Sequence, residues 1–359
     1  MVVGRLLLYA QFMLTHQLPD VGNQFEISDS VKKIIRENVD DGKHPALFVG
    51  IIDGDNVDYY CYGNTAKDGP TIDENTVFEI GSVTKVFTTL LLADMVEKGE
   101  IRLDDPIEKF LPEHMVTPSK NGKKITLLDL ATHTSGLPRF PDDFPIFDSD
   151  AMPKYDREKM YHYLSRVKIH REIGSQYEYS NIGISLLGHI ISLHAGQSYE
   201  KLVKTRISDK FGMENTCIKQ CDKLRDQFAR PHSFEHQVDE LNLSEDMMGA
   251  GEIRSSGKDM LTFLSYAMCM KESSLKSSFE LAQTANHKID DLLSVGLAWH
   301  ITQDDGGRKI IWHNGGTNGF ASIIGFDPES NQGVVVLTNS VIGVDDIAVW
   351  MFQHGHTST

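Results

Sequence analysis

Ser82 and Lys85 combine the residue types and the spacing that nucleophilic catalysis needs. Residues three positions apart in a helix share a face, so the hydroxyl and the amine can lie within hydrogen-bonding reach. A strand-like run ends at Gly81 and a hydrophobic helix follows, which places Ser82 at a helix N-terminus, where backbone N–H groups favour negative charge on a substrate oxygen. Burial in this helix would also desolvate the amine and lower its pKa toward that of a general base.

The spacing alone does not distinguish this pair. Ser-x-x-Lys also occurs at Ser30, Ser165, Ser198, Ser255 and Ser273. For any single match, the competing interpretation is a serine that caps a helix beside a solvated lysine. The prediction therefore depends on the setting of Ser82, between a strand-like run and a hydrophobic helix.

Tyr179 and Asn181 form a second candidate group, at the start of an apolar helix. In an extended or turning segment, a phenol and an amide two residues apart can point the same way and supply a proton relay and a substrate hydrogen bond. The alternative is a helix-capping asparagine beside a core tyrosine. Tyr62 and Asn64 repeat the spacing within a predicted hairpin, so the context again decides.

His313, Asn314, Gly315 and Gly316 form the third group, at the end of a strand-like segment. Paired glycines let a backbone come very close to a ligand. A backbone N–H in this segment can therefore complete a two-donor oxyanion hole with the N–H of Ser82. The alternative is a glycine turn or bulge.

The elements that would position these groups change in type along the chain. Short apolar runs between turns predict strands, and apolar residues at helical spacing predict helices. We expect helices over 28–38 and from 83 to 98, and strands over 46–52, 57–62, 296–301, 309–312, 321–327 and 333–338. Helices and loops are expected to dominate between 104 and 290.

These elements predict an α+β fold, with one antiparallel sheet built from both ends of the chain, flanked by helices and carrying an inserted, mostly helical lobe. The predicted division assigns 26–105 and 291–359 to the sheet domain and 106–290 to the lobe. Residues 1–25 are an N-terminal extension or signal-like segment. We place the site in the cleft between the two parts.

The order of the three groups resembles that of the penicillin-recognising serine hydrolases, which include class C beta-lactamases, DD-peptidases, D-aminopeptidases and related esterases. The matching segments are FEIGSVTKVFT (78–88), LLDLATHTSGLP (127–138), GAGEIRSSGKDM (249–260) and HNGGTNGF (313–320). The resemblance covers roughly residues 28–352 and implies the beta-lactamase/transpeptidase-like fold, a sheet with flanking helices and a helical lobe.

The resemblance also implies a role for each matched residue. Ser82 would attack a carbonyl while Lys85 or Tyr179 takes its proton, and Tyr179 would pass it to the leaving group. The N–H groups of Ser82 and Gly316 would form the oxyanion hole. The base stays open between Lys85 and Tyr179, because both side chains have ordinary pKa values near about 10. The implied substrate-binding residues are Asn181, His313, Asn314 and Gly315.

Position 313 departs from the family pattern, because beta-lactamases and DD-peptidases usually carry a lysine there that helps bind a substrate carboxylate. A histidine is largely neutral at pH 7 and supports a carboxylate less well. We therefore expect a hydrolase of esters or amides, acting on a short acyl ester, a D-amino-acid peptide or a beta-lactam. The alternatives are a true class C-type beta-lactamase or DD-peptidase, and a penicillin-binding sensor or scaffold without turnover. The same resemblance makes the loop around His133 a structural turn.

The composition excludes several classes of partner. The 359 residues are 40% hydrophobic, which can fill a substantial core. A net charge of -16 repels phosphate backbones, so we expect no nucleic-acid partner. No run approaches the roughly 18 apolar residues of a transmembrane segment. We expect a small-molecule or short-peptide substrate and no cofactor, and the oligomeric state stays open.

The cysteines and the N-terminal segment say little about the compartment. Cys61, Cys217, Cys221 and Cys269 are irregularly spaced and lack the pattern of a zinc site, so we predict no metal and interpret them as buried or free thiols. The less favoured alternative is a bridge between Cys217 and Cys221, which would need a favourable local geometry. Arg5 precedes an apolar run that resembles a short signal-peptide core without a small-residue cleavage site. A periplasmic or secreted location and a cytoplasmic one both stay open.

Overall fold

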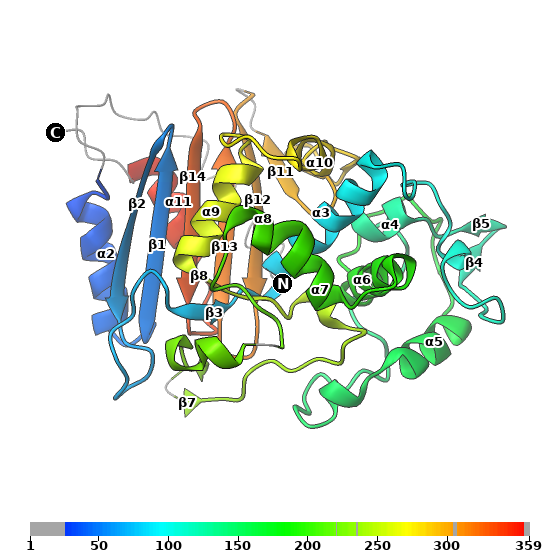
Figure 1. The fold of residues 1–359 in the computed structure, drawn as a ribbon, viewed down its shortest axis with the longest axis horizontal. Coiled ribbons are helices and arrows are strands. Elements are labelled where there is room, and N and C mark those ends of the chain that lie inside the picture. Colours follow the sequence, from blue (N-terminus) through cyan, green and yellow to red (C-terminus); the bar gives the residue numbers. More distant parts are fainter. Residues whose placement is uncertain (1–25, 220, 235, 304–306, 355–359) are drawn as a thin grey trace.

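An antiparallel sheet of eight strands runs through the molecule in the order β2-β1-β14-β13-β12-β11-β10-β9 (Figure 1). The computed structural model describes residues 26–219, 221–234, 236–303 and 307–354. The strands are β1 (Ala46–Asp53), β2 (Asn56–Gly63), β9 (His287–Lys288), β10 (Leu293–Val295), β11 (His300–Gln303), β12 (Lys309–Gly316), β13 (Ala321–Asp327) and β14 (Gln332–Thr338). Because β1 pairs with β14, both ends of the described chain contribute to one sheet, which confirms the predicted α+β fold.

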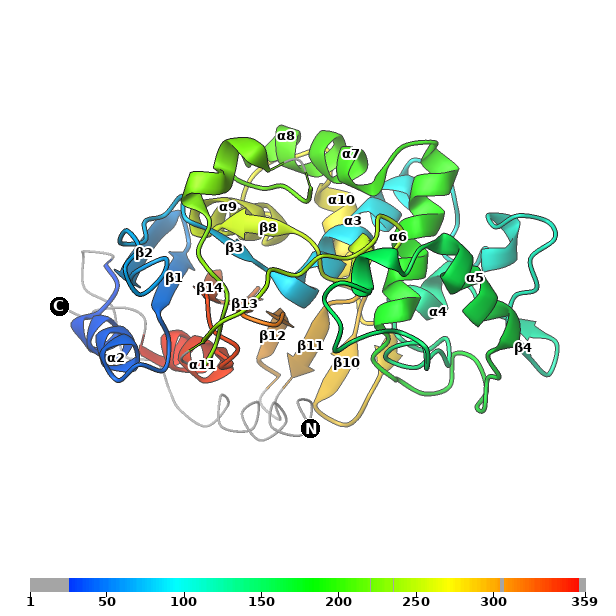
Figure 2. The same ribbon diagram turned by 90° about the horizontal axis from the view of Figure 1, so that it is seen from below.

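Helices cover both faces of the sheet. The covering helices are α2 (Asp29–Asp40) and α11 (Asp345–His354) on one face and α9 (Gly257–Ala267) on the other (Figure 2). Leu47 and Val49 of β1 pack in the cluster that includes α2 and α11, while Phe48 and Ile52 point into the larger core. Because side chains on a strand alternate between two buried faces, β1 is apolar at nearly every position.

The second part of the molecule is mostly helical. Its helices are α4 (Leu127–Ala131), α5 (Arg157–Arg166), α6 (Asn181–Ala195), α7 (Tyr199–Val203), α8 (Asp209–Phe211) and α10 (Lys276–Ala282). Its short strands form the pairs β3 (Val77–Glu79) with β8 (Arg254–Ser256), β4 (Ser119–Lys120) with β5 (Lys123–Lys124), and β6 (His232–Ser233) with β7 (His236–Gln237). Two elements of the predicted lobe belong to the sheet layer, since β9 is part of the sheet and α9 packs on β14 and β1. Gly257 permits this packing, because a Cβ there would lie 2.3 Å from the ring of Phe48.

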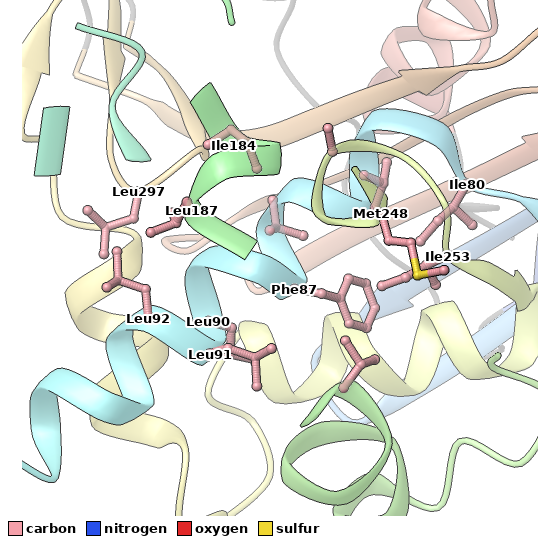
Figure 3. Close-up of a cluster of buried hydrophobic side chains, with 14 of the residues drawn as sticks. Ile80, Phe87, Leu90, Leu91, Leu92, Ile184, Leu187, Met248, Ile253 and Leu297 are labelled. Carbon is pink, nitrogen blue, oxygen red and sulfur yellow. The ribbon is translucent and has the colours of Figure 1, made fainter. Parts of the chain in front are cut away.

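The helix α3 (Thr84–Glu97) lies at the centre of the core, with Phe87, Leu90 and Leu91 among the side chains of Figure 3. Its residues from Thr84 to Met95 are buried on all sides, and Phe87 stacks on Phe263 of α9 at 4.0 Å between ring centroids. A helix that is buried all round needs no polar face, which explains its high apolar content. Lys85 is therefore placed in an apolar environment.

One predicted strand begins later than expected. The residues from 296 to 299 form a loop, and β11 starts at His300. Ala298 adopts a positive φ of 62°, which interrupts an extended backbone. The amide of Leu297 donates to Ala282 O and that of Ala298 donates to Ala131 O, so this segment binds helices of the lobe in place of a strand.

The interpretation of the cysteines as thiols was wrong for Cys217 and Cys221, for which the less favoured alternative, a disulfide, is found. Cys217 and Cys221 form a disulfide, whereas Cys61 and Cys269 are free. The segment is a loop anchored by an antiparallel bridge from Cys217 to Arg254, and this local geometry brings the two Cα atoms to 5.6 Å. Among the described residues, no helix combines the length and the apolar character needed to cross a bilayer.

Candidate active site

Ser82 lies in a single helical turn, Gly81–Val83, between β3 and α3. The amide of Ile80 donates to Ile253 O at 3.1 Å, which fixes the end of the strand before the turn. Gly81 has a φ of 48°, and a Cβ there would lie 2.7 Å from the amide nitrogen of Gly316. Glycine is thus required both by the turn and by the approach of β12. Ser82 is half-buried, so its hydroxyl lies at the boundary between core and solvent.

Lys85 is fully buried on the first turn of α3. Its Nζ lies 3.0 Å from Ser82 Oγ and donates a 2.6 Å hydrogen bond to the carbonyl of Ala250. Burial, followed by the nearby positive charge of Arg139, holds the pKa of Lys85 well below its usual value. The shift favours the uncharged amine, which can accept a proton.

Tyr179 precedes α6, and its phenol interacts with the side chain of Ser82. Burial raises the pKa of Tyr179 to about 12, although the interaction with Ser82 and the charge of Arg139 oppose the shift. Lys85 Nζ lies 4.9 Å from the centre of the Tyr179 ring. Asn181 begins α6 and is buried, and its backbone amide donates to Arg139 O at 2.9 Å.

The end of β12 lies directly against the turn that carries the serine. A Cβ on Gly315 would lie 2.1 Å from Ile80 O and 3.0 Å from the amide nitrogen of Ser82. The amide of Thr317 donates to Phe320 O toward β13, so strand alternation directs the amide of Gly316 to the opposite side.

The pairing of β12 with β11 ends at His300↔Trp312, before Gly316. The amide nitrogens of Ser82 and Gly316 therefore lie on two closely packed segments, because a Cβ on Gly315 would lie 3.0 Å from the first and a Cβ on Gly81 would lie 2.7 Å from the second.

His313 and Asn314 lie on opposite faces of β12. His313 is fully buried, and its ring centre is 6.3 Å from that of Tyr179. Asn314 instead donates from Nδ2 to Asp345 Oδ1 of α11 at 2.9 Å, so its side chain is engaged away from Ser82. Of the predicted site residues, the structure brings Ser82, Lys85 and Tyr179 into contact but gives Asn314 a partner on α11.

Two further histidines join this group, one stacked on Tyr179 and one beside His313, and the sequence pattern does not predict them. His133 stacks on Tyr179 with ring centres 4.6 Å apart, and His300 lies 5.3 Å from His313. His300 also contacts the hydroxyl of Tyr177 through Nε2 at 2.9 Å. His133 belongs to the segment for which the family resemblance predicts a structural turn. No motif in the neighbouring sequence distinguishes His300, which enters the site because β11 pairs with β12.

Burial lowers the pKa of all three imidazoles. The pKa of His300 falls to about 4, and the pKa values of His133 and His313 also lie well below the usual range. Neighbouring groups in their protonated forms would lower these pKa values further: His300 and then Lys85 at His313, and Lys85 at His133 and His300. His313 is thus neutral at pH 7, as its type suggested, and provides no cation on β12.

Arg139 is a third group that the sequence analysis missed. Its side chain is exposed, and its guanidinium carbon lies 5.2 Å from the centre of the Tyr179 ring. The distance is typical of a cation–π contact. Arg139 is the residue directly after the matched segment 127–138. It lies too far from Tyr179 in the sequence for the spacing to predict a contact, so the contact is seen only in the folded structure.

Buried polar contacts behind the turn hold it against β12. Ser322 of β13 donates to Ile80 O at 2.8 Å. Glu79 accepts the amide of Leu241 at 2.7 Å and lies 3.6 Å from Arg254. These contacts fix the strand before the nucleophile against β13 and β8. Within the described part of the chain, no cluster of His, Cys, Asp or Glu has the arrangement of a metal site.

The chain is similar to several known proteins. A profile of the beta-lactamase family matches residues 31–355. The D-alanyl-D-alanine-carboxypeptidase/endopeptidase AmpH of Escherichia coli K12 is 29% identical over 311 residues, covering 81% of this chain and 78% of that protein. A beta-lactamase of Pseudomonas fluorescens is 28% identical over 333 residues, covering 82% and 88% respectively. A solved class C beta-lactamase matches with a TM-score of 0.81 at 22% identity over 92% of this chain and 97% of that chain, which shows a shared fold.

Proposed function

The chain belongs to the beta-lactamase family and is a serine hydrolase, and on that premise we propose that it acts through an acyl-enzyme formed on Ser82. One observation carries the proposal: Ser82 Oγ lies 3.0 Å from the buried amine of Lys85, and its side chain also interacts with the phenol of Tyr179. Ser198 has the same spacing to a lysine, Lys201, but accepts the backbone amide of Lys201 as a helix cap. Ser198 thus fits the alternative interpretation of the motif, and Ser82 does not.

We assign Lys85 as the general base and Tyr179 as the general acid. The lowered pKa of Lys85 supplies a free amine beside the hydroxyl, whereas the raised pKa of Tyr179, about 12, keeps the phenol protonated. A base must be deprotonated and an acid protonated at the working pH. These opposite pKa shifts favour Lys85 over Tyr179 as the base, a choice that the residue types alone left open.

The reaction then proceeds in two halves. Ser82 Oγ bonds to the substrate carbonyl carbon as Lys85 takes its proton, and the N–H groups of Ser82 and Gly316 stabilise the oxyanion. The bond to the leaving group breaks as Tyr179 protonates it, and the proton held by Lys85 restores the phenol. In the second half, a water molecule loses a proton to Lys85 and attacks the acyl-enzyme. The bond to Ser82 Oγ then breaks as Lys85 returns that proton to the serine oxygen, which releases the acid and restores both side chains.

We propose peptides that end in D-alanine, beta-lactams and short acyl esters as substrates. The first two follow from the similarity to a protein named for D-alanyl-D-alanine carboxypeptidase and endopeptidase activity and to another named beta-lactamase. The site itself supports ester substrates. The amine of Lys85, the phenol of Tyr179 and the two backbone amides all act at the carbonyl and its leaving group, and they require no charge elsewhere on the substrate. Such peptides and beta-lactams carry a carboxylate, and neutral His313 does not provide its counter-ion.

The proposal is tested by hydrolysis of p-nitrophenyl acetate, nitrocefin and an acylated D-alanyl-D-alanine peptide. We expect an initial burst with the ester, and a loss of roughly 10⁴-fold or more in kcat in Ser82→Ala. Ser198→Ala is the matched control, because it removes a serine with the same spacing and should leave turnover intact. Equal rates in wild type and Ser82→Ala would refute the proposal. A stable penicillin adduct without turnover of any substrate would identify a sensor instead.

A further inference from the structure

Backbone hydrogen bonds hold Arg139 at the rim of the site. The side chain of Ser180 donates to Pro138 O at 2.7 Å, and the amide of Asn181 donates to Arg139 O at 2.9 Å. These bonds attach the segment 138–139 to the start of α6, directly beside Tyr179. The guanidinium, 5.2 Å from the centre of the Tyr179 ring, is therefore placed by the fold and still exposed to solvent.

Nearby carboxylates pair with other arginines and leave Arg139 without one. Asp142 and Asp143 both pair with Arg166, the latter at 3.0 Å. Glu178, which adjoins Tyr179, pairs with Arg171. Within the described ranges, no carboxylate forms an ion pair with Arg139, although the whole chain carries a net charge of -16.

The other basic groups of the site supply no positive charge at its exposed side. Lys85 is fully buried, and its role as base requires the neutral amine. His313, His133 and His300 are buried imidazoles. Arg139 is therefore the permanent cation among the described groups that contact Tyr179.

We propose that Arg139 binds a carboxylate of the substrate while Ser82 attacks its carbonyl. The inference rests on the proposed function and narrows its substrate class to esters and amides that carry a carboxylate. A guanidinium offers a planar fork of donors that fits a carboxylate with two hydrogen bonds. Contact with the Tyr179 ring holds that fork in place before substrate arrives, which reduces the entropy lost on binding.

Two pairs of esters test the proposal and show on which side of the scissile bond the carboxylate binds. Mono-4-nitrophenyl glutarate against 4-nitrophenyl butyrate places a carboxylate on the acyl side. 3-Acetoxybenzoate against phenyl acetate places it on the leaving group. In each pair, the ratio of kcat/KM for the anionic ester to that for the neutral ester is compared among wild type, Arg139→Gln and Arg139→Lys.

We expect Arg139→Gln to lower this ratio about tenfold in at least one pair, and Arg139→Lys to keep part of it. Added salt should lower the ratio in wild type and not in Arg139→Gln, because exposed charges are screened. Arg36→Gln is the matched control, since Arg36 is also exposed and lies over a tyrosine ring, Tyr60 at 5.9 Å, but belongs to α2.

The outcomes separate the inference from the proposed function. Hydrolysis that depends on Ser82, with the same ratios in Arg139→Gln and wild type in both pairs, overturns the inference and leaves the proposed function standing. Hydrolysis that survives Ser82→Ala refutes the proposed function, and the inference with it. Melting temperatures of the Arg139 variants close to wild type would show that any change in the ratio reflects binding and not folding.

Discussion

Replacing Gly315 by alanine should disable the oxyanion hole while leaving every proposed catalytic side chain in place. The added Cβ would lie 2.1 Å from Ile80 O, 2.5 Å from Ser322 Oγ and 3.0 Å from the amide nitrogen of Ser82. Since these contacts are backbone or buried, β12 must move by about 1 Å, and a displacement of this size can cost about 10²-fold in rate. Loss of one oxyanion donor costs about 10²- to 10³-fold in kcat.

The assay measures kcat for p-nitrophenyl acetate together with the melting temperature. We expect Gly315→Ala to lower kcat by at least about 10²-fold and to destabilise the protein by about 1–3 kcal/mol through overpacking. Gly316→Ala is the control for folding, because its Cβ would meet nothing closer than Phe320 O at 3.9 Å and its melting temperature should match wild type. Wild-type kcat and stability in Gly315→Ala would refute the close packing of β12 on the nucleophile turn.

Three further measurements test the site and the core. If Lys85 is the base, kcat/KM for a neutral ester should level off below pH 10, because the pKa of Lys85 is lowered. A rise in kcat/KM that continues toward pH 12 would instead assign the base to Tyr179, whose pKa is about 12. Phe87→Ala should cost about 3–5 kcal/mol in urea unfolding, because Phe87 is fully buried and stacked; a change under 1 kcal/mol would contradict its place in the core. Replacing Cys217 and Cys221 by serine should cost about 2 kcal/mol by loop entropy, whereas an unchanged unfolding midpoint would argue against the disulfide.

The local sequence pattern predicts those parts of the fold and the site whose geometry depends on residues close together in the sequence. The strand β1 and the hairpin to β2 follow from an apolar run, a turn and a returning run. The contact between Ser82 and Lys85 follows from helical spacing, because both lie within one turn of the start of α3. Here the short-range geometry of the chain decides the outcome.

The rest of the site depends on contacts that sequence spacing does not encode. Arg139 reaches Tyr179 because two carbonyls of its loop accept hydrogen bonds from the start of α6, and His300 enters through its pairing with Trp312. The partner of Asn314 depends on which face of β12 it occupies and on the packing of α11. A shift of one residue in strand register would exchange these faces, so a motif alone cannot assign them.

Mass spectrometry of the protein after reaction with benzylpenicillin tests the central claim most directly. Ring opening releases no leaving group, so an acyl-enzyme gains the mass of the whole molecule. We predict that this adduct forms in wild type, maps to the peptide containing Ser82, and is absent from Ser82→Ala. An adduct on any other residue, or one that persists in Ser82→Ala, would contradict the assignment of the nucleophile.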